Sequence, residues 1–409
     1  MAAPDSDNPA PSRPRFPPGF GAIWLSVALD LVGFGIVLPI LPLYAKQFGA
    51  TAVTATGLIT AFSAAQLVFS PIWGRVSDRI GRKPVLVLSM AGTAVASLVT
   101  GLAGAVWVLL LGRIIDGASG ASVSVAQAAV TDVAAPSERA HLLGLLGAAF
   151  GVGFVAGPAI GALAALGGPH VPFFVAAVIA GANAVWAAFR LPETHPDHSS
   201  RSFEIDHGSA VADPKRTDEG GPSVPSLLAV TFVALVAFSG FEATFALFGS
   251  RRLHLHLAST GVVFALVGLV IVVVEGGLVR PAVRAVGERS VLLFGLGGNA
   301  VGLALLARVH SYVGLVPALL LLTAGQGLVT PTLSAVLAGK VGAERRGGLL
   351  GVQQAAGGLA RIVGPIAAGL AFEHIGVPVP YSVGAAVMLA ATGLLAAVWR
   401  PAEPHVTVR

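Results

Sequence analysis

The stretch Gly74-Arg75-Val76-Ser77-Asp78-Arg79-Ile80-Gly81-Arg82-Lys83 joins two long apolar segments. It is echoed about 206 residues later by residues 280–289 (RPAVRAVGER), and the pairs Glu138-Arg139 and Gly157-Pro158 recur as Glu344-Arg345 and Gly364-Pro365. Such an internal repeat in an apolar chain indicates a membrane protein built from two related halves. Because a site between two such halves can face either side of the membrane in turn, the repeat predicts a transporter.

The composition supports a membrane protein and excludes several other classes. The 409 residues are 55% hydrophobic and only 11% charged, with a mean hydropathy of +0.82, so lipid must solvate much of the surface. The net charge of +5 raises nucleic-acid binding as an alternative. However, the basic residues lie in short loops between apolar segments, where membrane topology explains them, so no nucleic-acid partner is expected. Without cysteine, and without histidines at ligand spacing, we expect neither metal nor cofactor.

Apolar runs of roughly 20 residues, the length that crosses about 30 Å of hydrocarbon, define the predicted fold. The first run is too long for a signal-peptide core, so we expect it to be an uncleaved span. The prediction is an all-α membrane protein of twelve transmembrane helices in two pseudo-symmetric six-helix halves. The predicted spans are residues 20–44, 56–74, 84–104, 106–131, 141–166, 171–190, 226–249, 258–279, 290–307, 311–338, 347–371 and 379–399.

This division gives five parts: a disordered N-terminus (1–19), an N-terminal half (20–190), a linker (191–225), a C-terminal half (226–400) and a tail (401–409). The linker carries seven acids and three bases. That composition is typical of a solvated, flexible strap, and a functional role for it is the alternative.

The distribution of lysine and arginine predicts the orientation. Nineteen of the 25 basic residues fall in the termini and in the loops on one side of the predicted spans, and four fall in loops on the other side. Both termini are therefore expected in the cytoplasm, in a multi-pass protein of a bacterial-type cell membrane. The remaining two basic residues, Arg113 and Arg361, lie within spans.

Charged side chains inside spans are the main candidates for function, because each costs roughly 2.5–3.5 kcal/mol to insert and persists where it faces a cavity or a partner. Arg113 and Asp116 are three residues apart and therefore share one helix face. They form either an ion pair that only neutralises both charges or a proton-sensitive pair beside a central cavity. In the second reading, displacing the arginine would change how readily the carboxyl takes up a proton.

Two further acids are candidates, and each is a lone acid in the first span of its half. Asp30 is either a packing hydrogen-bond partner or a proton or cation site on the cavity. Glu242 is expected to be its counterpart in the second half, among four phenylalanines that pack or face lipid. An acid among aromatic rings also suits a lipophilic cation. The phenylalanines are Phe238, Phe241, Phe245 and Phe248.

These residues together resemble the major facilitator superfamily over nearly all of residues 20–400. The segment from Gly74 to Lys83 is similar to its signature loop, with Val76 where leucine is usual. The resemblance implies that Asp78 docks against the neighbouring half at the cytoplasmic face, and that Arg82 pairs with Asp132 at the end of the fourth span. The cytoplasmic gate is thus expected to comprise Gly74, Asp78, Arg79, Gly81, Arg82, Lys83 and Asp132.

Two more motifs resemble those of the twelve-span drug:H+ antiporters, which include the multidrug and tetracycline efflux pumps. Residues 111–117 (LGRIIDG) look like the family's motif of the fourth span, whose arginine is associated with proton transfer, although many members have glutamine where Asp116 stands. The antiporter motif of the fifth span is matched by Gly153, Gly157, Pro158 and Gly161, and is expected to shape the seal between the halves.

The resemblance implies a carrier that exports a small, partly lipophilic compound in exchange for protons, as a monomer in the lipid bilayer. Asp30, Arg113, Asp116 and Glu242 are the expected coupling residues. A symporter or uniporter for sugars or organic acids is the nearer alternative, against which the antiporter motif argues. A membrane enzyme or sensor is the more distant one, and the sequence holds no catalytic or nucleotide-binding motif.

Overall fold

The computed structural model describes residues 16–135, 138–194 and 221–399, and long helices make up most of this part. Helices satisfy their own backbone hydrogen bonds, which is a requirement for a segment that crosses lipid. They are α1 (Phe20–Lys46), α2 (Ala52–Ile80), α3 (Arg82–Gly101), α4 (Val106–Ser119), α5 (Ser122–Val133), α6 (Arg139–Ala165), α7 (Val171–Arg190), α8 (Val224–Arg252), α9 (Leu257–Val273), the π-helix η2 (Val274–Leu278), α10 (Val279–Leu306), α11 (Tyr312–Gly339), α12 (Ala343–His374) and α13 (Val379–Val398).

These helices make the predicted twelve crossings. Eleven helical stretches in the described residues are long and apolar enough to span, and one of them, Leu257–Leu306, has 50 residues. At 1.5 Å per residue it is about 75 Å long, enough for two crossings. It bends at Gly287 (φ 78°, ψ 160°) and therefore supplies the eighth and ninth spans. In the other direction, α4 and α5 together form the single fourth span, Val106–Val133.

The repeated loop differs from the sequence expectation in one respect. Most of Gly74–Lys83 is helical, because α2 continues to Ile80 and α3 begins at Arg82. Only Gly81 breaks the helix, with φ 101° and ψ 161°. Gly287, 206 positions later in the printed numbering, has nearly the same backbone conformation. A positive φ of this kind favours glycine, so both copies of the repeat turn at the same place for the same reason.

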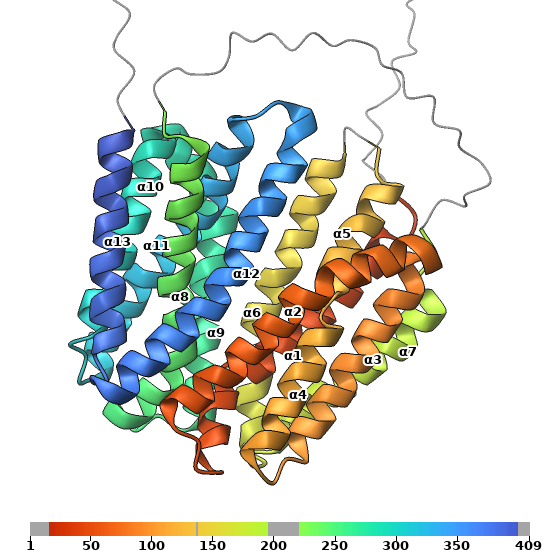
Figure 1. Cartoon of the computed structure of the whole chain (residues 1–409), viewed down its shortest axis with the longest axis horizontal. Helices are drawn as coiled ribbons and strands as arrows, with labels where there is room; N and C mark the ends of the chain where they lie inside the picture. Colours follow the sequence, from red (N-terminus) through yellow and green to blue (C-terminus); the bar gives the residue numbers. More distant parts are fainter. Residues whose placement is uncertain (1–15, 136–137, 195–220, 400–409) are drawn as a thin grey trace, which may run out of the picture.

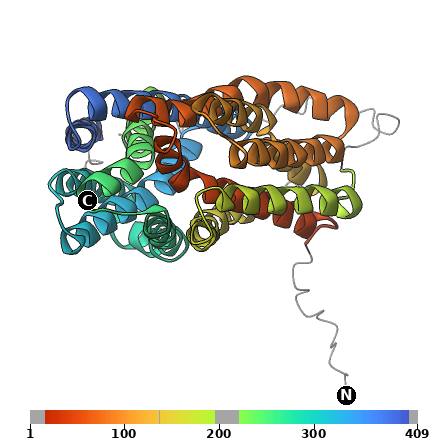
Figure 2. The same ribbon diagram turned by 90° about the horizontal axis from the view of Figure 1, so that it is seen from below.

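The two halves, α1–α7 and α8–α13, lie side by side (Figures 1 and 2). Inside each half, the first and fifth spans pack through glycines. A Cβ at Gly157 of α6 would lie 2.7 Å from the Cα of Gly35 in α1, and one at Gly240 of α8 would lie 3.3 Å from the carbonyl oxygen of Gly364 in α12. The same close approach at matching positions supports the pseudo-symmetry of the halves.

The halves meet mainly along two helix pairs, α2 with α12 and α6 with α9, and α1 also contacts α8 and α9. The Thr60 hydroxyl of α2 donates to the carbonyl of Ile362 in α12 at 3.5 Å. At the other seam, a Cβ on Gly268 of α9 would meet the backbone of Phe154 in α6. Each seam thus joins the second span of one half to the fifth span of the other.

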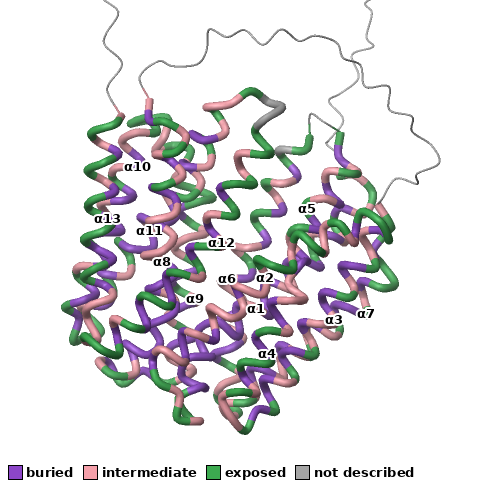
Figure 3. The backbone as a smooth tube through the Cα atoms, viewed as in Figure 1, coloured by how far each residue is buried: buried purple, intermediate pink, exposed green. Residues whose placement is uncertain are grey.

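The start of α1 and the end of α13 lie at one face of the bundle, here called the terminal face, and α2 begins at the opposite face (Figure 1). Glycines at the terminal-face ends of α6 and α12, such as Gly144 and Gly351, have nothing within 4 Å of an added Cβ. Further along, Gly157 and Gly369 meet neighbouring helices. Buried positions correspondingly gather toward the opposite face (Figure 3). The halves are therefore closed at the opposite face.

A carboxylate links the two halves at that closed face. Glu373, near the end of α12, accepts a hydrogen bond of 2.8 Å from the backbone N–H of Val53 in the first turn of α2. The N-terminus of a helix has unpaired N–H groups and a partial positive charge, so a carboxylate stabilises it. Glu373 thus joins α12 to the start of α2 at the closed face.

Replacing Glu373 by Gln should open the opposite face more often, because the amide loses the negative charge that favours the α2 N-terminus. A contact of this kind contributes about 1 kcal/mol, which corresponds to roughly a fivefold shift between closed and open states. Spin labels on cysteines replacing Gln47 and Ile375, in a chain that has no cysteine of its own, would report longer distances by electron double resonance. Glu288→Gln, an exposed change in α10, is the matched control, and unchanged distances in Glu373→Gln would refute the role of this contact.

Candidate functional site

The carboxyl of Asp30 lies on α1 at about mid-depth, ten residues from the helix start, or roughly 15 Å along its axis. Its Oδ2 accepts a hydrogen bond of 2.5 Å from the hydroxyl of Ser122 at the start of α5. Its Oδ1 is buried and has no hydrogen-bond partner within the described residues. One oxygen is therefore held in place while the other is available for a proton or a ligand.

Arg113 and Asp116 of α4 form the ion pair that their spacing allows. Nη1 of Arg113 lies 3.1 Å from Oδ2 of Asp116, and the side chains are only 3% and 8% exposed. The hydroxyl of Thr93 in α3 also donates to Asp116, and Asp116 lies near enough to Asp30 for the two carboxyls to repel each other. The N-terminal half thus gathers three ionisable groups from α1 and α4.

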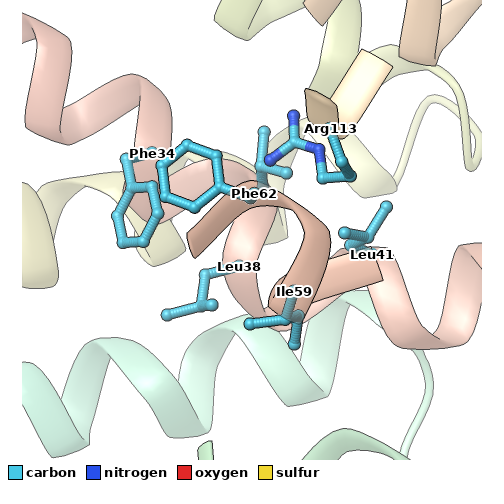
Figure 4. Close-up of a pocket in the computed structure, with 7 residues that line it drawn as sticks. Phe34, Leu38, Leu41, Ile59, Phe62 and Arg113 are labelled. Carbon is cyan, nitrogen blue, oxygen red and sulfur yellow. The ribbon is translucent and has the colours of Figure 1, made fainter. Parts of the chain in front are cut away.

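Arg113 of this cluster lines a small pocket (Figure 4). The pocket is lined by Arg113 and by apolar side chains of α1 and α2, and its volume is about 10 Å³, roughly enough for one water molecule. The guanidinium carbon of Arg113 lies 5.8 Å from the centre of the Phe62 ring. The apolar lining residues are Phe34, Val37, Leu38, Leu41, Ile59 and Phe62.

The C-terminal half carries a second pair of opposite charges. Glu242 of α8 and Arg361 of α12 attract each other electrostatically. Nη2 of Arg361 would lie 3.8 Å from a Cβ on Gly357, one turn earlier on α12. The sequence identified Arg361 as an intramembrane charge but did not pair it with Glu242. Because the two are 119 positions apart, only the packing of α8 on α12 brings them together.

Glu242 and Asp30 lie in equivalent spans, since each is on the first helix of its half, but they lie at different positions along those helices. When Gly35 is matched to Gly240, Asp30 lies five residues before its glycine and Glu242 two residues after. Seven residues are two helical turns, about 10 Å, so the two acids share a helix face but differ in depth. The two acids therefore lie in equivalent spans at different depths, and an equivalent role for Glu242 stays a prediction.

The predicted ion pair of the signature loop is present. Nε of Arg82 donates to Oδ2 of Asp132 at 2.9 Å, and Nη1 of Arg82 lies 2.6 Å from Oδ1 of Asp78. Arg82 is 11% exposed, whereas Asp78 is 60% exposed. Arg79 is exposed at the end of α2, Lys83 lies in the first turn of α3, and Gly74 has open space at its Cβ position.

Sequence reasoning missed Glu193, the third residue after α7. Its carboxylate accepts the backbone N–H groups of Arg82 and Lys83 at 2.8 and 3.2 Å, and so caps α3. A Cβ at Gly81 would collide with this carboxylate, which is a second reason for glycine there. Glu193 falls in the predicted linker, and most of that linker (residues 195–220), like residues 1–15 and 400–409, lies outside the described residues.

The three glycines of the antiporter motif and its Pro158 have different neighbours. Gly153, Gly157 and Gly161 all pack on α1, within their own half. The seam with α9 lies on the adjacent face of α6, where the carbonyl of Pro158 would be 2.9 Å from a Cβ on Gly261. The three motif glycines therefore let α6 approach α1, whereas the seam with α9 contains Gly151 of α6 and Gly261 and Gly268 of α9.

Twelve crossings in two related halves, closed at one face and with ionisable groups buried at mid-depth, define a membrane carrier rather than an enzyme. The family model of the Major Facilitator Superfamily matches residues 23–286 and 278–409. The chain therefore belongs to the major facilitator superfamily, whose members are multi-pass membrane transporters of small molecules.

Curated relatives and solved structures agree with this assignment. The chain is 33% identical over 347 residues to a tetracycline resistance protein of class G from Vibrio anguillarum, covering 84% of this chain and 87% of the relative. It is 28% identical to Multidrug resistance protein 2 of Bacillus subtilis (strain 168), covering 92% and 93%. The structure of the human organic anion transporter MFSD10 (TETRAN) is similar with a TM-score of 0.67 at 27% identity, covering 92% of this chain and 98% of that one.

Proposed function

We propose that this carrier exports small, partly lipophilic compounds in exchange for protons by alternating access, with both termini in the cytoplasm and the monomer as the working unit. The observation that carries this proposal is the group of carboxyls at mid-depth, Asp30 and Asp116 beside Arg113, next to a largely apolar pocket. Intramembrane carboxyls of this kind are typical of proton relays in transporters.

Exchange requires that proton and substrate compete. Asp30 has one oxygen without a partner, and its neighbour Asp116 repels a second negative charge. Substrate bound beside this cluster would favour one of its charge states, and a proton would favour the other. By reciprocity, a substrate that expels a proton is itself expelled when the proton returns. An inward proton contributes about 2.3 kcal/mol per 100 mV to this cycle.

The names of the relatives support the direction of transport and the kind of substrate. Proteins named for resistance to tetracycline or to multiple drugs match more than four fifths of the chain. Resistance by a carrier requires export. The closed opposite face would then be the external one, and the cluster would receive its substrate from the terminal, cytoplasmic face. Glu242 with Arg361 supplies the charged groups of the C-terminal half.

The gate assignment is part of the same proposal. Arg82 bridges Asp78 at the end of α2 and Asp132 at the end of α5. It therefore links the terminal-face ends of α2, α3 and α5 to one another. When the terminal face closes, this end would dock on the other half through Asp78. The five-part division of the chain, with the linker as a strap between two moving halves, belongs to the proposal as well.

Tetracycline uptake into proteoliposomes tests the proposal and its alternatives together. With an acidic lumen, an antiporter exchanges outgoing protons for incoming substrate, so tetracycline should accumulate above the level in protein-free liposomes. Accumulation only with an alkaline lumen would indicate a symporter, and uptake that ignores the gradient would indicate a uniporter. Either result would overturn proton antiport.

A further inference from the structure

Basic side chains gather at the opposite face of the C-terminal half, on the side where the sequence places few of them. This face holds four lysines and arginines, and three of these, Arg251, Arg252 and Arg308, belong to the C-terminal half. Glu373 is the one acid among the described residues at this face, and it already binds the start of α2. The bias of basic residues toward the terminal face leaves few here, so a local group of three needs its own explanation.

A histidine fixes the position of Arg252, the last residue of α8. Nδ1 of His310 donates to the carbonyl of Arg308 at 2.8 Å, so Nε2 of the same ring carries the lone pair that accepts from Nη1 of Arg252. No carboxylate pairs with Arg252 or Arg308 within the part of the chain that the structure describes. Arg251 is engaged by α12 instead, with its guanidinium carbon 4.8 Å from the centre of the Phe372 ring. Arg252 is thus held in a defined place with donors to spare.

Tyr312 places this group at the depth of the lipid headgroups. Its hydroxyl donates to the carbonyl of Leu253 at 2.8 Å, which ties the end of α8 to the start of α11. Its ring is exposed, and tyrosines of membrane proteins gather at the boundary between hydrocarbon and headgroups. Because Arg252 adjoins Leu253 and His310 lies two residues before Tyr312, both lie at the same boundary.

Exposed apolar side chains continue from Tyr312 toward the middle of the membrane. Val313, Val316 and Leu320, here called the apolar strip, are exposed and share one face of α11 because they are three and four residues apart. The N-terminus of α11, which begins at Tyr312, adds a partial positive charge above this strip. Positive charge above exposed apolar side chains is complementary to a phosphate joined to acyl chains.

We propose that Arg252, Arg308 and the start of α11 form a binding site for an anionic phospholipid. The phosphate accepts hydrogen bonds from Arg252, and an acyl chain lies along the apolar strip. A lipid with a net negative charge fits because no carboxylate of the described residues pairs with either arginine. A zwitterionic lipid brings an ammonium group of its own, so it should bind less tightly. This inference is independent of the proposed function, since it concerns the lipid-facing surface of the C-terminal half.

Quenching by spin-labelled lipids tests the site in nanodiscs that hold the full-length carrier. A bimane fluorophore is attached to Val313→Cys, the only cysteine of that variant. It is quenched by phosphatidylglycerol or by phosphatidylcholine, each with a nitroxide at the same acyl position. The relative affinity fitted to the quenching should favour phosphatidylglycerol at least about fivefold, the effect of one arginine near an anionic lipid. Equal quenching by the two lipids would overturn the proposal.

A second label separates a local site from a general attraction of anionic lipids to the protein. Leu163→Cys lies near the same end of α6, in the other half, and is also exposed. A bimane there should be quenched nearly equally by the two lipids. A preference for phosphatidylglycerol of the same size at both labels would refute a site at Arg252.

Variants assign the preference to the two arginines. Arg252→Gln combined with Arg308→Gln should abolish it at the Val313→Cys label, whereas Lys46→Gln, at the fourth basic residue of this face, should leave it unchanged. Salt gives an answer even if the double variant does not fold. At 1 M ionic strength the screening length falls to about 3 Å, so most of the preference should disappear with both arginines present. A preference that survives either the double variant or 1 M salt would refute the assignment.

Discussion

Asp30→Asn is expected to reduce proton-driven accumulation of substrate to the level of protein-free liposomes, while exchange of labelled for unlabelled substrate continues. The amide has nearly the shape of the carboxyl and can still bond to the Ser122 hydroxyl, so α1 and α5 keep their packing. It cannot bind or release a proton. Coupling should therefore fail, and the movement of the two halves should persist.

Two assays separate these effects. Accumulation with an acidic lumen measures coupling, and exchange without a gradient measures the substrate-bound transition. Ser122→Ala is the matched control, because it removes the same hydrogen bond but leaves a titratable carboxyl, so a substantial part of the accumulation should remain. Full accumulation by Asp30→Asn would remove Asp30 from the coupling mechanism. If Ser122→Ala were as inactive as Asp30→Asn, the hydrogen bond rather than the proton would be what matters.

Gly157→Leu is expected to destroy the packing of α6 on α1 and to leave little folded protein. A Cβ at this position would lie 2.7 Å from both the Cα of Gly35 and the carbonyl oxygen of Val32. Both obstacles are backbone atoms, so no side chain can move aside. Overpacking typically costs 1–3 kcal/mol, and this site should lie at about 3 kcal/mol or above, more than a hundredfold in the folding equilibrium.

The protein that survives a heat step, measured by size-exclusion chromatography, reports this loss. Gly144→Leu is the matched control on the same helix, since nothing lies within 4 Å of an added Cβ there, and it should differ from the wild type by less than about 0.5 kcal/mol. The repeat predicts the same contrast in the second half, between Gly364→Leu and Gly351→Leu. Equal losses in Gly144→Leu and Gly157→Leu would show that leucine is harmful anywhere on α6.

The features that could be predicted from sequence are those that depend on spacing along the chain. Span length predicts the twelve crossings, and a separation of three residues predicts the pair Arg113–Asp116. The turn at Gly81 and its repeat at Gly287 follow from the duplicated loop. The pairing of Arg82 with Asp132 was implied by resemblance, since no spacing rule connects α3 to α5.

The remaining features depend on how the helices face one another, which the sequence does not state. The bond from Ser122 to Asp30, the attraction between Arg361 and Glu242, and the Glu193 cap on α3 all join distant segments. Small residues on α6 predicted close packing but not which helix Gly157 would pack against. Gly157 packs on α1, and the face of α6 toward α9 is the next one around the helix.

The most direct test of the account is whether substrate and proton displace each other at this cluster. Tetracycline would be added to the purified carrier in weakly buffered detergent solution, and a pH-sensitive dye would report protons released or taken up. The account predicts proton release on binding by the wild type and none by Asp30→Asn. Proton uptake, or binding without any change in proton content, would contradict it.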